Sequence, residues 1–291
     1  MGNIFLDYDQ KALDDAYDQA VYAPNREQLL ARRNSNSAGA RRRLGEPGRF
    51  AYGPGRNEQL DVYASATPAA PINVFIHGGA WRVGRARDYA APAEMFVDAG
   101  AHYVVLDFDN VEEAGGDLFV MARQVRGALA WVYRNAAAFG GDPHRLYVSG
   151  TSSGAHLGAV AATTEWRKDF DLPDDMVKGY TLCSGMYDLR GPRLSKRSAY
   201  VKFTDEAEVA LSPQRHLERI HAPITLLYGS YETPEFKRQA QEFAAALTTA
   251  GKPVDLIHAE GYNHFEIQET LASPYGAMGR AVLAQMQLDS G

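Results

Sequence analysis

The segment 145–158 constrains the fold of this chain more than any other stretch. It holds Gly150-Thr-Ser152-Ser-Gly154, which follows an apolar run typical of a strand and precedes a run of small residues typical of a helix. A serine between a strand and a helix must lie on a tight turn, and a glycine two residues to either side lets backbones approach where a side chain would clash. The helix aims its free N–H groups and the positive end of its dipole at that turn. The segment therefore predicts a serine placed to act as a nucleophile.

The length and composition of the chain suit one large domain. Of its 291 residues 45% are hydrophobic, and we interpret residues 1–291 as a single α/β domain. The net charge of -6 argues against a nucleic-acid partner. The single cysteine, Cys183, excludes an internal disulfide and fits a reducing compartment. Because we find neither a secretory signal pattern nor an apolar run of membrane-spanning length, we expect a cytoplasmic protein with no membrane partner; a homodimer stays open.

Apolar spacing divides the chain into parts. Residues 1–45 are polar with helix-like apolar spacing and predict an N-terminal helical arm, and residues 45–56, rich in glycine and proline, predict a loop. From residue 60 onward strand and helix patterns alternate, which predicts a mainly parallel sheet covered by helices on both faces. Residues 188–219 lack a clean period. We expect them to form a cap-like insertion over the carboxyl edge of the sheet, where the active sites of such sheets lie.

A second motif, His77-Gly78-Gly79-Ala80-Trp81, follows the apolar run 72–76. An enzyme that transfers acyl groups needs N–H donors aimed at the oxyanion of its tetrahedral intermediate, and a glycine-rich turn after a strand supplies them without side chains in the way. We therefore expect an oxyanion hole, with His77 ordering the turn. Its residues would be Gly78, Gly79, Ala80 and Ser153. A simple turn is the alternative.

Three side chains stand in the order that a catalytic triad of this kind requires. A serine hydroxyl needs an adjacent base, and the base needs a carboxylate that fixes its tautomer. Ser152, Glu232 and His264 each follow a predicted strand, and the carboxyl ends of parallel strands meet at one edge of a sheet. We predict that these three residues converge. Glu235, at a predicted helix start, and Asp255, inside a predicted strand, remain alternatives for the acid.

Aromatic residues gather beside these motifs. Trp81, Tyr187, Tyr231, Tyr262 and Phe265 could wall a pocket for a flat ligand, although each alone is compatible with ordinary packing. We find no paired-histidine spacing typical of a metal site and no glycine-rich dinucleotide motif after a strand. The sequence therefore predicts a small aromatic substrate and neither a metal nor a cofactor.

Four segments, 76–82, 150–156, 228–236 and 263–265, carry a resemblance to a known family. Together they resemble the arylformamidase (kynurenine formamidase-like) branch of the α/β hydrolases, close to the hormone-sensitive-lipase-type esterases. The resemblance spans roughly residues 50–290. Family members commonly have histidine where this chain has Thr151.

The resemblance implies the α/β-hydrolase fold and a serine hydrolase that needs no cofactor. Its substrate would be an N-formyl or other small acyl amide of an aromatic compound, or a related ester or carbamate, cleaved through an acyl-enzyme. A short-chain carboxylesterase is one alternative, because the same triad cleaves esters. A non-catalytic binding protein on the same fold is the other, although such relatives usually lack a member of the triad.

Overall fold

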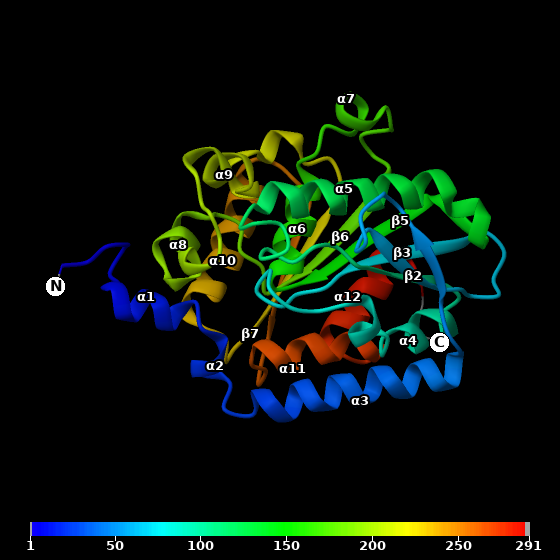
Figure 1. The fold of residues 1–291 in the computed structure, drawn as a ribbon, viewed down its shortest axis with the longest axis horizontal. Coiled ribbons are helices and arrows are strands. Elements are labelled where there is room, and N and C mark those ends of the chain that lie inside the picture. The colour runs from blue at the N-terminus through cyan, green and yellow to red at the C-terminus, as the bar shows by residue number, and fades with distance from the viewer. Residues whose placement is uncertain (1, 289–291) are drawn as a thin grey trace.

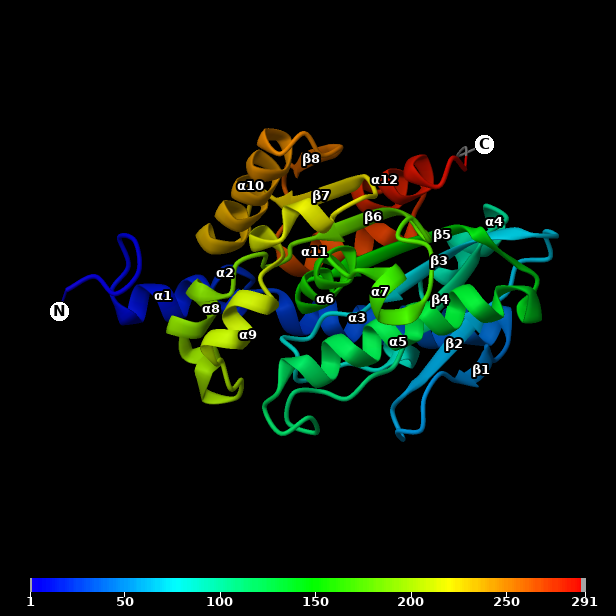
Figure 2. The same ribbon diagram turned by 90° about the horizontal axis from the view of Figure 1, so that it is seen from above.

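An eight-stranded sheet forms the centre of the computed structural model, which describes residues 2–288. Its strand order is β1-β2-β4-β3-β5-β6-β7-β8, as Figure 2 shows. The strands are β1 (Gly48–Ala51), β2 (Gln59–Tyr63), β3 (Ala70–Ile76), β4 (His102–Leu106), β5 (Gly141–Thr151), β6 (Val177–Cys183), β7 (Ile224–Gly229) and β8 (Val254–Ala259). The pairs β1–β2 and β2–β4 at one edge are antiparallel. In the order of the sheet, every pair from β4 across to β8 is parallel. The predicted α/β fold with a mainly parallel sheet is confirmed.

Both faces of the sheet are buried because the inner strands carry apolar residues at almost every position. Side chains alternate between the faces, so Val74 and Val104 pack into one core and Phe75 and Val105 into the other. Figure 1 shows α5 (Leu118–Asn135) and α6 (Ser153–Ala162) on the first face, with α10 (Pro234–Thr249). The second face is covered by α4 (Ala93–Asp98), α11 (His264–Glu269) and α12 (Ala277–Gln285).

The N-terminal arm consists of α1 (Gln10–Ala16), α2 (Gln19–Tyr22) and α3 (Arg26–Leu44). Figure 1 shows α3 running along α11 and α4, outside the second face of the sheet. Its contacts with the body are largely polar. Arg32 pairs with Glu269, and the Arg43 guanidinium lies 2.5 Å from the Glu94 carboxylate.

The insertion consists of short helical turns rather than one long helix. They are α8 (Arg190–Leu194), η3 (Lys196–Ala199), α9 (Asp205–Ala210), η4 (Pro213–Arg215) and η5 (Leu217–Arg219). The insertion contacts the arm, since Lys196 pairs with Asp18 and Arg197 Nη2 donates to the Tyr17 carbonyl at 3.0 Å. The remaining short helices of the chain are η1 (Ala86–Tyr89), η2 (Ala136–Phe139), α7 (Trp166–Phe170) and η6 (Thr270–Ala272).

Two local predictions were wrong. Residues 45–56 hold strand β1 in addition to turns, because β1 is an edge strand whose side chains are mostly exposed and show no apolar alternation. The segment after the last strand, residues 261–265, was expected to be a loop, but His264 is the first residue of α11. The Asn263 side chain caps this helix by accepting from the N–H groups of Phe265 and Glu266. None of the helices in the described part of the chain combines the length and apolar character needed to cross a membrane.

Candidate active site

Ser152 lies on the sharp turn between β5 and α6. Its backbone angles are φ 55° and ψ -124°, a region that residues with a side chain rarely adopt and that costs about 1–3 kcal/mol. A Cβ added to Gly150 would lie 2.8 Å from the Gly154 carbonyl oxygen, and one added to Gly154 would lie 2.0 Å from the Ile76 carbonyl oxygen. The two glycines therefore let the turn pack against itself and against β3, which holds Ser152 at the carboxyl edge of the sheet.

Ser152, His264 and Glu232 form one line of hydrogen bonds. His264 Nε2 lies 3.0 Å from Ser152 Oγ, and His264 Nδ1 lies 2.9 Å from Glu232 Oε2. All three residues are buried. In the neutral tautomer that this geometry favours, Nδ1–H donates to the carboxylate and Nε2 accepts from the hydroxyl. The arrangement can move the hydroxyl proton onto the imidazole as Ser152 attacks an electrophile.

The second oxygen of Glu232 is also occupied. Glu232 Oε1 accepts from the Ser184 hydroxyl and from the Gly229 N–H, the latter at 3.3 Å. These two donors fix the plane of the carboxylate and leave Oε2 for His264. The sequence reasoning missed Ser184, because no local motif marks it, although it directly follows β6 at the edge where the other three residues lie.

The structure separates Glu232 from the alternative acids. Glu235 is buried in the first turn of α10, where it accepts from the Tyr17 hydroxyl at 2.8 Å and pairs with Arg238 at 2.7 Å. Asp255 is exposed on β8. Of these three carboxylates, Glu232 is the one that contacts His264.

The turn 77–81 lies against Ser152. Gly79, Ala80 and Trp81 have φ values of 118°, 55° and 61°, and a Cβ on Gly78 would lie 3.0 Å from the Ser152 Cβ. Trp81 N–H donates to Ser153 Oγ at 3.1 Å. Within residues 2–288 the N–H groups of Gly79, Ala80 and Ser153 have no hydrogen-bond partner. The site therefore has free backbone donors beside the Ser152 hydroxyl, as an oxyanion hole requires.

His156, in α6, holds Trp81 in place. It accepts from Trp81 Nε1 at 3.2 Å through Nδ1, and its Nε2–H donates to the Leu211 carbonyl at 2.8 Å. Burial lowers the pKa of His156 from 6.5 to about 4. A second proton would have to occupy Nδ1, which already faces a donor. The neutral imidazole is therefore the form that the folded protein stabilises.

This predicts a loss of stability in acid. Between pH 6.5 and about 4 the unfolded chain binds a proton at His156 that the folded chain does not, so the free energy of unfolding falls as the pH falls. It is unaffected by this group above pH 6.5. Near pH 4 the loss is on the order of 3 kcal/mol. Urea unfolding at pH 7 and pH 4.5 should show a smaller pH-dependent difference for His156→Gln than for the wild type. Equal differences would contradict the assignment.

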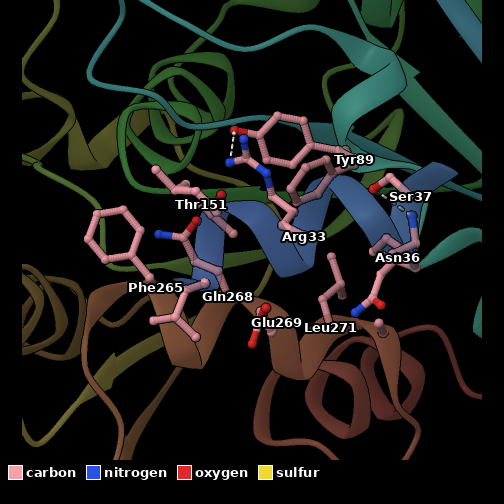
Figure 3. Close-up of a pocket in the computed structure, with 15 residues that line it drawn as sticks. Arg33, Asn36, Ser37, Tyr89, Thr151, Phe265, Gln268, Glu269 and Leu271 are labelled. Atoms are coloured by element: carbon pink, nitrogen blue, oxygen red, sulfur yellow. Dashed lines mark hydrogen bonds between the residues drawn. The ribbon is translucent and has the colours of Figure 1, made fainter. Parts of the chain in front are cut away.

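A cavity of about 60 Å³ lies between α3 and α11, next to the elbow. Figure 3 shows Thr151 and Phe265 on one side of it and Arg33 and Tyr89 on another. Much of the remaining lining is apolar, from Leu29, Leu30, Phe75 and Leu271. Thr151 precedes Ser152 and Phe265 follows His264, so the cavity is lined by the chain neighbours of the two reactive residues and not by those residues themselves. The Thr151 hydroxyl is buried without a hydrogen-bond partner in the described part of the chain.

The predicted pocket residues do not gather at one place. Phe265 lines the cavity, but Tyr187 is wholly buried and stacks on Phe243 at 4.4 Å between ring centroids. Tyr187 is therefore part of the core, and its predicted role as a pocket wall is wrong. Tyr231 is 61% exposed on the outer side of the Glu232 loop. Trp81 is buried against His156. Proximity to a motif in the sequence did not reveal the direction of these side chains.

Comparisons with known proteins agree with this geometry. The family model described as BD-FAE matches residues 60–184. A kynurenine formamidase of Danio rerio is 31% identical over 227 residues, which cover 76% of this chain and 75% of that protein. Esterase LipQ of Mycobacterium tuberculosis is 28% identical over 284 residues, with 87% of this chain and 67% of that protein covered.

The solved structure of esterase LipW from Mycobacterium marinum has the same fold. It superposes with a TM-score of 0.69 over 93% of this chain and 90% of that one, at 20% identity. The similarity to the kynurenine formamidase and to esterase LipQ shows that the chain is a hydrolase of the amide or ester type. The sheet topology, the elbow and the extent of similarity to the formamidases lead to one conclusion: the chain belongs to the arylformamidase (kynurenine formamidase) family of α/β hydrolases.

Proposed function

We propose that the protein is a serine hydrolase that removes a small acyl group, formyl above all, from the nitrogen of an aromatic amine. The observation that carries the proposal is the continuous hydrogen-bonded line Ser152–His264–Glu232 beside a turn with free N–H groups. A binding protein has no need for a nucleophile, a base and an orienting carboxylate that are hydrogen-bonded in this order.

The reaction proceeds in two halves. His264 Nε2 takes the proton of Ser152 while Oγ bonds to the carbonyl carbon, and the N–H groups of Gly79, Ala80 and Ser153 bind the oxyanion. The C–N bond then breaks, and His264 gives its proton to the leaving amine. In the second half water attacks the acyl-enzyme with the same proton transfers, which releases the acid and restores Ser152.

The cavity supports a small acyl group and an aromatic partner. Its volume of about 60 Å³ is small, which favours a compact acyl group. Phe75, Tyr89 and Phe265 supply aromatic surface around it. The name of the Danio rerio relative, a kynurenine formamidase, supports an amide substrate.

A short-chain carboxylesterase is the second candidate, because the similarity to esterase LipQ covers 87% of this chain. Both activities use the same residues, and they differ in the leaving group that His264 must protonate. An alkoxide or phenoxide can leave without prior protonation far more readily than the anion of an amine can. Ester cleavage therefore depends less on how His264 positions the proton for the leaving group.

A panel of N-formyl, N-acetyl, carbamate and ester compounds with one shared aromatic leaving group tests the proposal. We expect the N-formyl compound to be cleaved at least about tenfold faster than the N-acetyl compound, because one added methyl group in a small cavity costs about that much. The Ser152→Ala variant supplies the background rate. Cleavage of the ester alone, with neither amide turned over, would favour the carboxylesterase instead.

A further inference from the structure

We propose that the arm helix α3 positions the oxyanion turn and that Arg33 does so through the hydroxyl of Tyr89. The inference rests on the proposed function of that turn. It assigns a role in the reaction to a helix that lies outside the sheet and its two covering layers (Figure 1).

Arg33 reaches from α3 to the hydroxyl of Tyr89. Its Nη1 donates to the Tyr89 oxygen at 3.0 Å, and its guanidinium carbon lies 4.5 Å from the centroid of the Tyr89 ring (Figure 3). Arg33 forms no ion pair with any carboxylate in residues 2–288. A guanidinium can only donate, so the phenol oxygen accepts from it and keeps its own single proton for another acceptor.

That acceptor is the carbonyl of Gly78. The Tyr89 oxygen lies 3.4 Å from it, and His77 Nδ1 lies 2.8 Å from the same oxygen. His77 is stacked between Tyr89 and Phe108, with ring centroids 5.2 and 4.5 Å away. Burial lowers the pKa of His77, so the ring is neutral and its one proton lies on Nδ1, toward the carbonyl. Two donors therefore hold the Gly78 oxygen from the same side.

Holding this carbonyl fixes the direction of the next N–H group. The peptide between Gly78 and Gly79 is planar and trans, so the Gly79 N–H points away from the Gly78 oxygen. Because the Gly78 oxygen is held toward Tyr89 and His77, the Gly79 N–H points to the opposite side of the turn. That is the side on which Gly78 lies against Ser152. A peptide between two glycines rotates easily, and without these donors its N–H could leave the oxyanion.

The same face of α3 holds the backbone around Tyr89. Ser37 is one helical turn beyond Arg33, so both side chains project from one side of the helix. Ser37 Oγ donates to the Asp88 carbonyl at 2.8 Å and accepts from the Ala91 N–H at 3.3 Å. Arg33 and Ser37 thus fix the segment 88–91, and that segment supports the oxyanion turn.

A double-mutant cycle tests the role of Arg33. In Arg33→Met the aliphatic cover of Tyr89 remains but the donor is lost, and in Tyr89→Phe the ring stacking remains but the hydroxyl is lost. We expect each variant to lower kcat for the N-formyl compound by roughly three- to thirtyfold, less than the loss of an oxyanion donor itself, with KM within about twofold. The double variant should be no slower than the slower single variant, because both changes break one line of contacts.

Two further measurements separate positioning from general damage. The affinity for an aryl trifluoromethyl ketone, which binds Ser152 as an oxyanion, should fall by the same factor as kcat. Arg42→Met is the matched control on α3: Arg42 is exposed and forms no ion pair in residues 2–288, so this variant should leave kcat unchanged. Melting temperatures of all variants show whether the fold is retained, and Arg33→Lys, which keeps a donor, should recover part of kcat.

Several results would overturn the inference. It fails if Arg33→Met lowers kcat by the same factor in the Tyr89→Phe background, or if the variants raise KM and leave kcat and ketone affinity intact. If the wild type cleaves the N-formyl compound and the variants are as active as the wild type, only this inference is wrong. A wild type that cleaves no member of the panel removes the proposed function as well.

Discussion

Ser152→Ala is expected to lower kcat/KM for the N-formyl compound by about four to six orders of magnitude. The hydroxyl is the group that His264 deprotonates, and no other hydroxyl hydrogen-bonds to His264 Nε2 within residues 2–288. The residual rate would come from the free N–H groups and from substrate binding alone.

The fold should be unaffected, because alanine keeps a Cβ at the same backbone angles and therefore neither adds nor relieves strain. Equal melting temperatures for the variant and the wild type would verify this. The exposed Ser198 provides a matched control, since Ser198→Ala should keep full activity. A phosphonate probe should label the wild type at Ser152, as located by mass spectrometry, and should not label Ser152→Ala. Residual activity above about a tenth of the wild-type value would contradict the assignment.

Glu232→Gln is expected to lower kcat by about three to four orders of magnitude while the side-chain shape stays the same. The reason is the tautomer of His264. Ser184 and Gly229 both donate to Oε1, so the amide of the variant presents its oxygen to them and its NH2 group to His264. Nδ1 must then accept, the proton moves to Nε2, and His264 can no longer accept the proton of Ser152.

Single-turnover kinetics of Glu232→Gln at neutral pH would measure this loss in the acylation step. Glu235→Gln is the informative comparison, because Glu235 lies three residues away and is equally buried. It should lower the melting temperature, since Tyr17 and Arg238 lose their carboxylate partner, yet largely keep kcat. A larger loss of kcat in Glu235→Gln than in Glu232→Gln would reverse the choice of acid.

The sequence predicted best those features that depend on local pattern. Ser152, His264 and Glu232 each follow a strand, so strand patterns alone were enough to place them at one edge of the sheet. β1 was missed because an exposed edge strand needs no apolar alternation. Tyr187 was misplaced because the identity of an aromatic residue does not tell whether it faces a pocket or the core.

Contacts between distant parts of the chain were out of reach of such patterns. Ser184 bonds to Glu232 across 48 positions, and Arg33 bonds to Tyr89 across 56. A serine after a strand or an arginine on a polar helix is too common to predict a partner. Their roles emerge only when the tertiary packing shows which donors face which acceptors.

The way α3 docks has a consequence for the conditions under which the enzyme works. Leu29 is the one large apolar side chain that is buried among the 19 residues of α3, all of which the structure describes. Much of the remaining attachment of the helix is through charged pairs at the surface. Mobile ions weaken such pairs, whereas they hardly affect a buried apolar core. Catalytic competence is thus tied to ionic strength through the arm, while the stability of the central sheet is not.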